Sequence, residues 1–320
     1  MRGIHHIEVS NSTVKYEFDI KRNITVIKGN SATGKTTLVE MISEYYDSGE
    51  NSGVSVVCDK ECRVISGREW KVLLGTISDS IVFIDEDNEF LPTVEFADAA
   101  KNSDNYYVIV TREGLANLPY SVDEIYGIRS SGKYAGLKQV YHELYHIYSY
   151  DSGQLDLFPE VVIVEDSNSG YDFFEEISKN KGYTVISAKG KSNFFKVIME
   201  NRDKRMLVIA DGAAFGSEMD RVMKLVSGDS HVALFLPESF EWLILSSGVI
   251  KNRISLEVLE HSSDYIESSE YFSWERFFTH YLVETTRNSY LKYNKSRLNP
   301  VYLHEDNKKA ILATMEHVKI

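Results

Sequence analysis

The sequence predicts an α/β fold built from two modules, because short apolar runs and helix-like segments alternate twice along the chain. The first series of alternating segments occupies residues 1–130 and the second occupies residues 159–240. Such alternation is typical of mostly parallel sheets covered by helices. Residues 241–320 have a largely helical pattern. A chain of 320 residues is long enough for two domains, each with its own core.

The first module opens with two alternating runs, 4–10 and 14–20, that predict an antiparallel hairpin across Asn11 and Ser12. Strands and helices should then alternate in a mostly parallel sheet. The expected strands are 23–29, 54–59, 80–87, 106–112 and a last one near 124–129, and the expected helices are 35–46, 69–77 and 93–102.

Residues 131–158 predict a helical linker, because the Tyr-rich segment 137–150 has a helical pattern between two Gly-containing turns. The boundary between the modules is expected near Ser152. The second series predicts strands over 161–166, 182–190, 205–212 and 231–238, helices over 170–180, 193–201 and 217–228, and further helices over 239–250, 273–293 and 307–320.

A net charge of −13 argues against a surface largely devoted to nucleic acid, which needs clustered Lys and Arg. Two segments are nevertheless basic. Residues 179–205 hold eight Lys and Arg against two acids, and residues 287–320 hold seven against three. They predict either solvated faces or contacts with DNA or RNA.

The chain has no apolar run of about 18 residues, so no membrane-spanning helix is expected. Its N-terminus lacks the apolar core of an export signal, and we expect a cytoplasmic protein. Its two cysteines, Cys58 and Cys62, supply neither a disulfide framework nor a four-ligand zinc site.

The segment GNSATGKT matches the P-loop pattern and lies between an expected strand and an expected helix. Its glycines allow backbone N–H groups to face phosphates at the helix N-terminus. Lys35 would contact the β and γ phosphates, and the Thr36 hydroxyl would bind Mg²⁺. The predicted nucleotide-binding residues of this segment are Gly29, Asn30, Ser31, Ala32, Thr33, Gly34, Lys35, Thr36 and Thr37.

A second motif supports ATP hydrolysis as well as binding. The apolar run 80–84 is followed by Asp85 and Glu86, as in a Walker B strand. Asp85 would bind the Mg²⁺ of Mg-ATP, and Glu86 would orient or deprotonate the attacking water, which makes Glu86 and Lys35 the predicted catalytic residues. Thr111 and Arg112 follow the next strand, where a polar side chain would sense the γ-phosphate; the alternative is a solvated strand end.

The first 115 residues or so resemble the ATPase heads of the ABC type, including those of the overcoming-lysogenization-defect (OLD) nucleases. The chain departs from that family because it has neither an LSGGQ-like segment nor a long inserted arm before residue 80. The resemblance implies a bacterial or mobile-element defence role, such as phage defence. Whether the chain acts as a homo-oligomer or with a partner protein is left open by the missing signature segment.

The second module carries acids at the ends of two expected strands, Glu165 and Asp211. Ligands collect at the carboxyl ends of parallel strands, and two neighbouring carboxylates suit Mg²⁺. The alternative is an α/β domain whose acids only cap loops and helices.

This module resembles a Toprim domain, the metal-dependent module of topoisomerases, primases and OLD nucleases. The resemblance implies a Mg²⁺ site at Glu165 and Asp211, and places Gly216 at the family's later glycine. Asp172 and Glu241 are expected to join the metal site, with Glu238 as the second choice for the last position. Ala213 stands where the family has its second aspartate, which leaves open whether the site is active.

A competing motif, His142-Glu143-Leu144-Tyr145-His146, matches the HExxH signature of zinc proteases on the helix expected over 137–150. On a helix, His142 and His146 would face the same way with Glu143 as the base, although no third ligand follows at a known spacing.

The sequence thus predicts a Mg-ATP-dependent ATPase that controls a Toprim-like domain acting on nucleic acid. The alternatives are an ATP-dependent regulatory protein with an inactive second domain, a P-loop kinase, for which no Arg-rich lid is seen near the P-loop, and a zinc protease.

Overall fold

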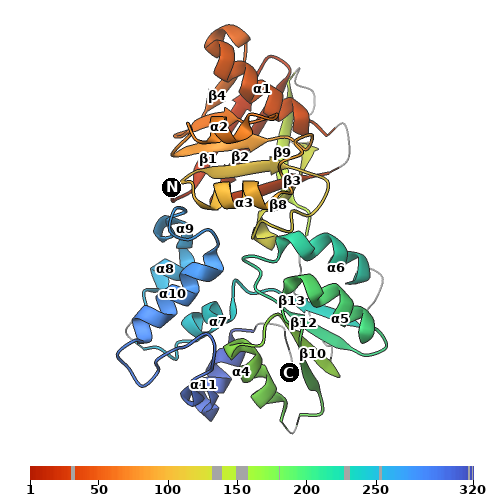
Figure 1. Cartoon of the computed structure of the whole chain (residues 1–320), viewed down its shortest axis with the longest axis vertical. Coiled ribbons are helices and arrows are strands. Elements are labelled where there is room, and N and C mark those ends of the chain that lie inside the picture. Colours follow the sequence, from red (N-terminus) through yellow and green to blue (C-terminus); the bar gives the residue numbers. More distant parts are fainter. Residues whose placement is uncertain are drawn as a thin grey trace. The chain divides into compact units, whose positions relative to one another are not determined.

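The computed structural model describes residues 1–29, 33–131, 139–148, 158–179, 181–226, 231–251, 254–315, 318 and 320. The chain separates into two compact units. The first contains Met1–Ser149 and His261–Ser273, and the second contains Tyr150–Glu260 and Trp274–Ile320. Each unit has its own sheet with helices packed on it, which confirms the mixed α/β class (Figure 1).

The sheet of the first unit is mixed. Its parallel part has β3 (Ile24–Lys28) between β7 (Tyr106–Val110) and β8 (Ile125–Ser130). Among the described residues nine strands pair in the order β4 (Ser55–Val57), β1 (His5–Ser10), β2 (Val14–Ile20), β9 (Val140–His146), β8, β3, β7, β6 (Ser80–Ile84) and β5 (Glu61–Val64). The hairpin of β1 and β2 is antiparallel, as predicted. Strand β5 was missed, because its run of four residues includes the charged residues Glu61 and Arg63.

Helices cover both faces of this sheet. Helix α1 (Lys35–Ser48) buries Leu38 and Ile42 in a core cluster that includes Val108 of β7. The next side chain back along β7, Tyr107, points to the opposite face and contacts Phe96 of α3 with ring centroids 5.8 Å apart. Further helices of this unit among the described residues are α2 (Trp70–Leu74), α3 (Val94–Lys101), η1 (Gly49–Ser52), η2 (Val122–Glu124) and α9 (Ser262–Tyr265).

The second unit has a fully parallel sheet among its described residues. Its strands pair in the order β11 (Thr184–Ser187), β10 (Val161–Val164), β12 (Met206–Ile209) and β13 (Val232–Phe235). The helices are α4 (Ser169–Ser178), η4 (Lys191–Asn193), α5 (Phe194–Glu200), η5 (Gly216–Glu218), α6 (Met219–Val226), α7 (Phe240–Ser246), α8 (Leu256–Glu260), α10 (Trp274–Thr286), η6 (Pro300–Leu303) and α11 (Glu305–Ala313).

The C-terminal region is not a single helical block, because the segment His261–Ser273 belongs to the first unit. Gly3 N–H donates to the Ser263 carbonyl at 2.8 Å, and Ser268 N–H donates to the Met1 carbonyl at 2.9 Å. The segment therefore holds the N-terminus in place through backbone hydrogen bonds, which side-chain patterns do not reveal.

The helical linker expected over 131–158 is wrong for Val140–His146, which form strand β9. This strand pairs antiparallel with β8 and parallel with β2. Tyr145 lies over Gly127 of β8, where a Cβ atom would be 2.5 Å from the tyrosine ring. Sheet pairing on both sides therefore overrides the helical pattern, in a segment whose Val and Tyr residues also favour strands.

Candidate functional site

The P-loop segment connects β3 to α1 at the carboxyl end of a central strand. Gly29 and Gly34 have φ angles of 142° and 93°, a region that favours glycine. The Lys35 ammonium donates to the Gly29 carbonyl at 2.8 Å and to Thr33 Oγ1 at 3.2 Å. The Lys35 ammonium therefore contacts described residues on both sides of positions 30–32. Three of the predicted residues, Asn30, Ser31 and Ala32, lie outside the described residues.

The start of α1 suits an anion. No acidic residue lies in its first turn, and the side chains of Thr36 and Thr37 are exposed there. Burial lowers the pKa of Lys35, which is 5 % exposed, while Glu86 and Asp85 raise it and Arg112 lowers it. Charged groups at the ends of β6 and β7 thus influence the pKa of Lys35.

Two aromatic residues, Tyr16 and His142, pack next to Gly34 at the end of the P-loop segment. Tyr16 Oη donates to the Gly34 carbonyl at 2.8 Å, and a Cβ atom on Gly34 would be 2.7 Å from that oxygen. The His142 ring stacks on Tyr16, with centroids 4.8 Å apart and planes 13° from parallel. Sequence reasoning missed this support, because it assigned His142 to a zinc motif.

Asp85 and Glu86 follow β6, and Thr111 and Arg112 follow β7, which lies between β6 and β3. Asp85 Oδ1 accepts the Glu86 N–H at 2.7 Å. The Thr111 hydroxyl donates to the Glu113 carbonyl at 3.1 Å, within a local turn. The structure therefore places all four predicted residues at the same edge of the sheet as the P-loop.

Arg112 forms a bidentate ion pair with Glu86. Its Nε donates to Glu86 Oε2 at 2.9 Å and its Nη2 donates to Oε1 at 2.6 Å. Both residues line a cavity of about 460 Å³, together with Asn88, Thr111 and Glu113. The sequence placed Arg112 near a phosphate but did not indicate its pairing with the predicted catalytic glutamate.

The helix required by the zinc-protease alternative is absent, because His142 and His146 belong to strand β9. Four residues along a strand separate the two positions by about 13 Å, too far for one metal ion. Glu143 Oε1 accepts from Arg129 Nε at 2.8 Å, and the His146 ring packs on Tyr126 at 4.6 Å. The interpretation of this HExxH segment as a zinc site is therefore wrong.

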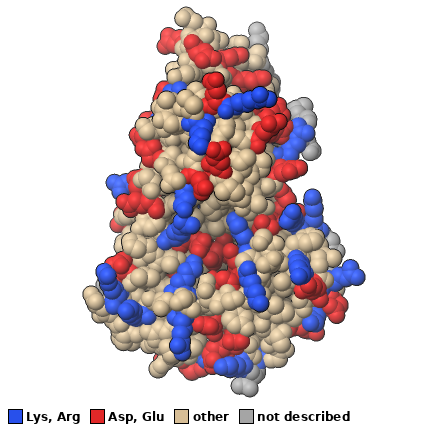
Figure 2. All heavy atoms as spheres, viewed as in Figure 1, with Lys and Arg blue, Asp and Glu red and all other residues tan. Residues whose placement is uncertain are grey.

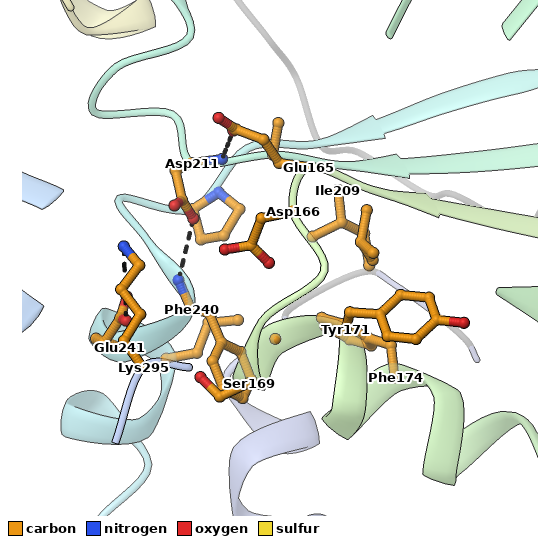
Figure 3. A pocket seen from close by; sticks show the side chains of 15 residues that line it. Glu165, Asp166, Ser169, Tyr171, Phe174, Ile209, Asp211, Phe240, Glu241 and Lys295 are labelled. Atoms are coloured by element: carbon orange, nitrogen blue, oxygen red, sulfur yellow. Dashed lines mark hydrogen bonds and ion pairs between the residues drawn. The ribbon is translucent and has the colours of Figure 1, made fainter. Parts of the chain in front are cut away.

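The acids of the second unit gather at the carboxyl edge of its sheet, around the space shown in Figure 3. Glu165 follows β10 and Asp211 follows β12, which are paired parallel strands. Asp211 N–H donates to Glu165 Oε2 at 3.1 Å. Asp211 Oδ1 accepts the N–H of Phe240, the first residue of α7, at 3.2 Å.

Glu241 lies at the same pocket, next to Lys295 (Figure 3). Its Oε1 accepts from Tyr293 Oη at 2.8 Å and is 3.9 Å from Lys295 Nζ. Lys295 Nζ also donates to Glu275 Oε1 at 2.5 Å. Sequence reasoning missed Glu275, Tyr293 and Lys295, because no motif connects them to the strand-end acids.

Burial dominates the electrostatics of this acidic pocket, whose cavity is only about 30 Å³. Burial raises the pKa of Glu165 to about 7. Burial, with Glu275 and Glu165 nearby, raises the pKa of Asp211 well above its ordinary value. Burial also raises the pKa of Glu241, although Lys295 opposes the shift. The pocket therefore favours protons or cations near its acids.

Two other predicted acids are placed differently. Asp172 does not line the pocket, and its Oδ2 accepts the Leu298 N–H at 3.0 Å. Glu238 also does not line the pocket, and its carbonyl accepts the Ala213 N–H at 3.3 Å. Within the described part of the chain, no group of three or more His, Cys, Asp or Glu is arranged to hold a metal ion.

Many residues of the two basic segments are paired with acids of the same unit. Examples are Lys179 with Glu176 at 2.5 Å and Arg205 with Glu160 at 3.3 Å. On the face shown in Figure 2, Lys and Arg side chains over the second unit are interspersed with acidic ones. This mixture resembles a solvated surface more than a continuous basic track.

Comparison with protein families finds no family that matches this chain, and no curated protein matches it significantly. Among the helices that the structure describes, none has both the length and the apolar composition needed to cross a membrane.

Proposed function

We propose that the first unit binds ATP with Mg²⁺ and hydrolyses it. The observation that supports this most is the arrangement around Lys35. Its ammonium contacts Gly29 and Thr33, Gly29 and Gly34 have positive φ angles, and the helix that Lys35 begins has no acids in its first turn. Asp85 and Glu86 follow a strand at the same sheet edge. Lys35 would neutralise phosphate charge, and Glu86 would orient the attacking water.

The chemistry of the available donors fits a magnesium ion. Thr36 has an exposed hydroxyl in the first turn of α1, and Asp85 presents a carboxylate at the end of β6. Mg²⁺ prefers such oxygen ligands and usually shares them with the phosphates of its nucleotide. When bound, the ion would neutralise charge on the phosphates, while the protein residues fix their position.

Two substitutions test this function. Lys35→Ala should weaken ATP binding by about 100-fold, because it removes a buried charge that pairs with phosphate. Glu86→Gln should not weaken binding and should reduce the rate of phosphate release by about 100-fold or more, as expected for loss of a general base. Binding is measured by calorimetry and turnover by phosphate release. Unchanged ATP turnover in both variants would exclude the assignment.

For the second unit, we propose a Toprim-like domain that acts on nucleic acid under the control of the ATPase. The supporting observation is that Glu165, Asp211 and Glu241 line one pocket at the carboxyl edge of a parallel sheet. Carboxylate oxygens of this kind suit Mg²⁺. An inactive domain that controls a partner through the ATP state is the alternative, and Ala213 in place of a second aspartate favours it.

A nuclease assay distinguishes these two roles. The protein is incubated with single-stranded and duplex DNA and RNA, with ATP, in Mg²⁺ or Mn²⁺. If the domain is active, the double variant Glu165→Ala/Asp211→Ala should lose cleavage by at least about 100-fold, because both carboxylates are removed. Asp172→Ala is the matched control outside the pocket. Cleavage that survives in the double variant has another source, and its absence from the wild type favours the inactive alternative.

A further inference from the structure

The ion pair between Arg112 and Glu86 occupies both oxygens of the predicted catalytic carboxylate. The pair has two hydrogen bonds, 2.9 and 2.6 Å long, in the geometry that gives Arg-carboxylate contacts their strength. Glu86 is 19 % exposed in its side chain, whereas Arg112 is 59 % exposed. The glutamate is therefore held at the sheet edge by an arginine that reaches it from the solvent side.

This contact opposes the role proposed for Glu86. Both oxygens of the Glu86 carboxylate accept N–H groups of the guanidinium, so Arg112 competes with an attacking water molecule for them. Glu86 would become an effective base only after the guanidinium of Arg112 moves to another anion.

A nucleoside triphosphate supplies such an anion. Arg112 follows β7, which pairs in parallel with β3, the strand that leads into the P-loop segment, so Arg112 and Lys35 lie at the same edge of the sheet. A terminal phosphate carries more charge than one carboxylate and offers the same fork of oxygen acceptors, for which arginine is well suited. A diphosphate lacks that terminal group. The guanidinium would therefore move from Glu86 to the phosphate when ATP binds, and not when ADP binds.

We propose that Arg112 is a latch on Glu86 that the third phosphate of the nucleotide releases. In this inference, which depends on the ATPase function proposed above, Arg112 pairs with Glu86 in the absence of a third phosphate. When ATP binds, Arg112 transfers to the terminal phosphate and Glu86 becomes available to water. One side chain thus links recognition of the triphosphate to activation of the base.

The test compares the affinities for ADP and for a non-hydrolysable ATP analogue in single and double variants. Arg112→Ala should weaken binding of the ATP analogue about tenfold, the order expected for loss of a charge-assisted hydrogen bond, and leave ADP binding unchanged. Glu86→Gln should tighten binding of the analogue severalfold, because the neutral amide competes less for the guanidinium. In Arg112→Ala/Glu86→Gln, that gain should disappear.

Arg129→Ala is the matched control. Arg129 also pairs with a glutamate, Glu143, at 2.8 Å, and its side chain is 61 % exposed. This variant should bind both nucleotides as the wild type does. The latch is excluded if Arg112→Ala weakens ADP and the ATP analogue equally, or if Glu86→Gln leaves the ratio of the two affinities unchanged. If Lys35→Ala has no effect on either nucleotide, the nucleotide site itself is excluded.

Discussion

The two candidate sites lie at the carboxyl edges of two sheets but hold their charges in different ways. In the first unit, Glu86 is paired with an exposed arginine beside a cavity of about 460 Å³. In the second unit, Glu241 is 2 % exposed and the acids surround a cavity of about 30 Å³. The cavity of the first unit adjoins Glu86 and Arg112 but is lined by no described P-loop residue, whereas the second site is a compact cluster of acids with lysine near them.

This difference shows that the surroundings of similar strand-end acids depend on which segments pack over them. In the first unit, Glu86 and Arg112 border a cavity and form an ion pair in which the arginine side chain is exposed. A ligand can therefore compete with Glu86 for the guanidinium. In the second unit, α7 and the segment carrying Lys295 close over the acids, and burial raises their pKa values. A ligand that binds there must replace or join the existing contacts of the acids, such as those of Glu241 with Tyr293 and Lys295.

The largest effect that would sharpen this comparison is expected for Gly212→Ala, next to Asp211. A Cβ atom at this position would be 2.5 Å from the Leu236 carbonyl oxygen and 2.9 Å from that of Pro237. Because both neighbours are backbone atoms, the acidic pocket must shift, and we expect about 3 kcal/mol of destabilisation. Thermal and denaturant unfolding would measure this change.

The control for this change is Gly170→Ala, in α4. Its Cβ atom would be 3.4 Å from the ring of Phe240, an ordinary contact, and alanine favours a helix. This variant should be as stable as the wild type or more so. ATP affinity should be unchanged in Gly170→Ala; a loss of ATP affinity in Gly212→Ala would show that the two sites are coupled.

A smaller effect is expected in the pH dependence of stability. The pKa of Glu165 is raised to about 7 in the folded state. Between about pH 4.5 and 7, the folded state therefore keeps a proton on this carboxyl that the unfolded chain has lost. Stability from this group is therefore complete below the unfolded pKa and is lost as the pH rises towards 7. The slope is at most about 1.4 kcal/mol per pH unit.

Denaturant unfolding in metal-free buffer from pH 4.5 to 7.5 measures this slope. Glu165→Gln cannot titrate, so its stability should decline less steeply over that range than the wild type's. Parallel profiles for the two proteins would contradict a raised pKa at Glu165 and would remove electrostatic burial as the feature that distinguishes the second site.

Local pattern was sufficient for the elements that carry both sites. The buried runs Ile24–Lys28 and Ser80–Ile84 form strands as predicted, and Lys35 begins a helix. The gathering of Glu165 and Asp211 also followed from the sequence, because parallel neighbouring strands bring their carboxyl ends together. Local pattern misassigned Val140–His146, where apolar and aromatic residues fit both a helix and a strand.

The sequence by itself determined the strand-loop-helix arrangement at Lys35 and the order of acids at the strand ends, since these depend on residues close together in the chain. Only the tertiary structure decided that His142 supports the P-loop, that Arg112 holds Glu86 and that Lys295 accompanies Glu241. These contacts join residues from separate segments, and their formation depends on strand pairing and side-chain packing between those segments, which no local pattern encodes.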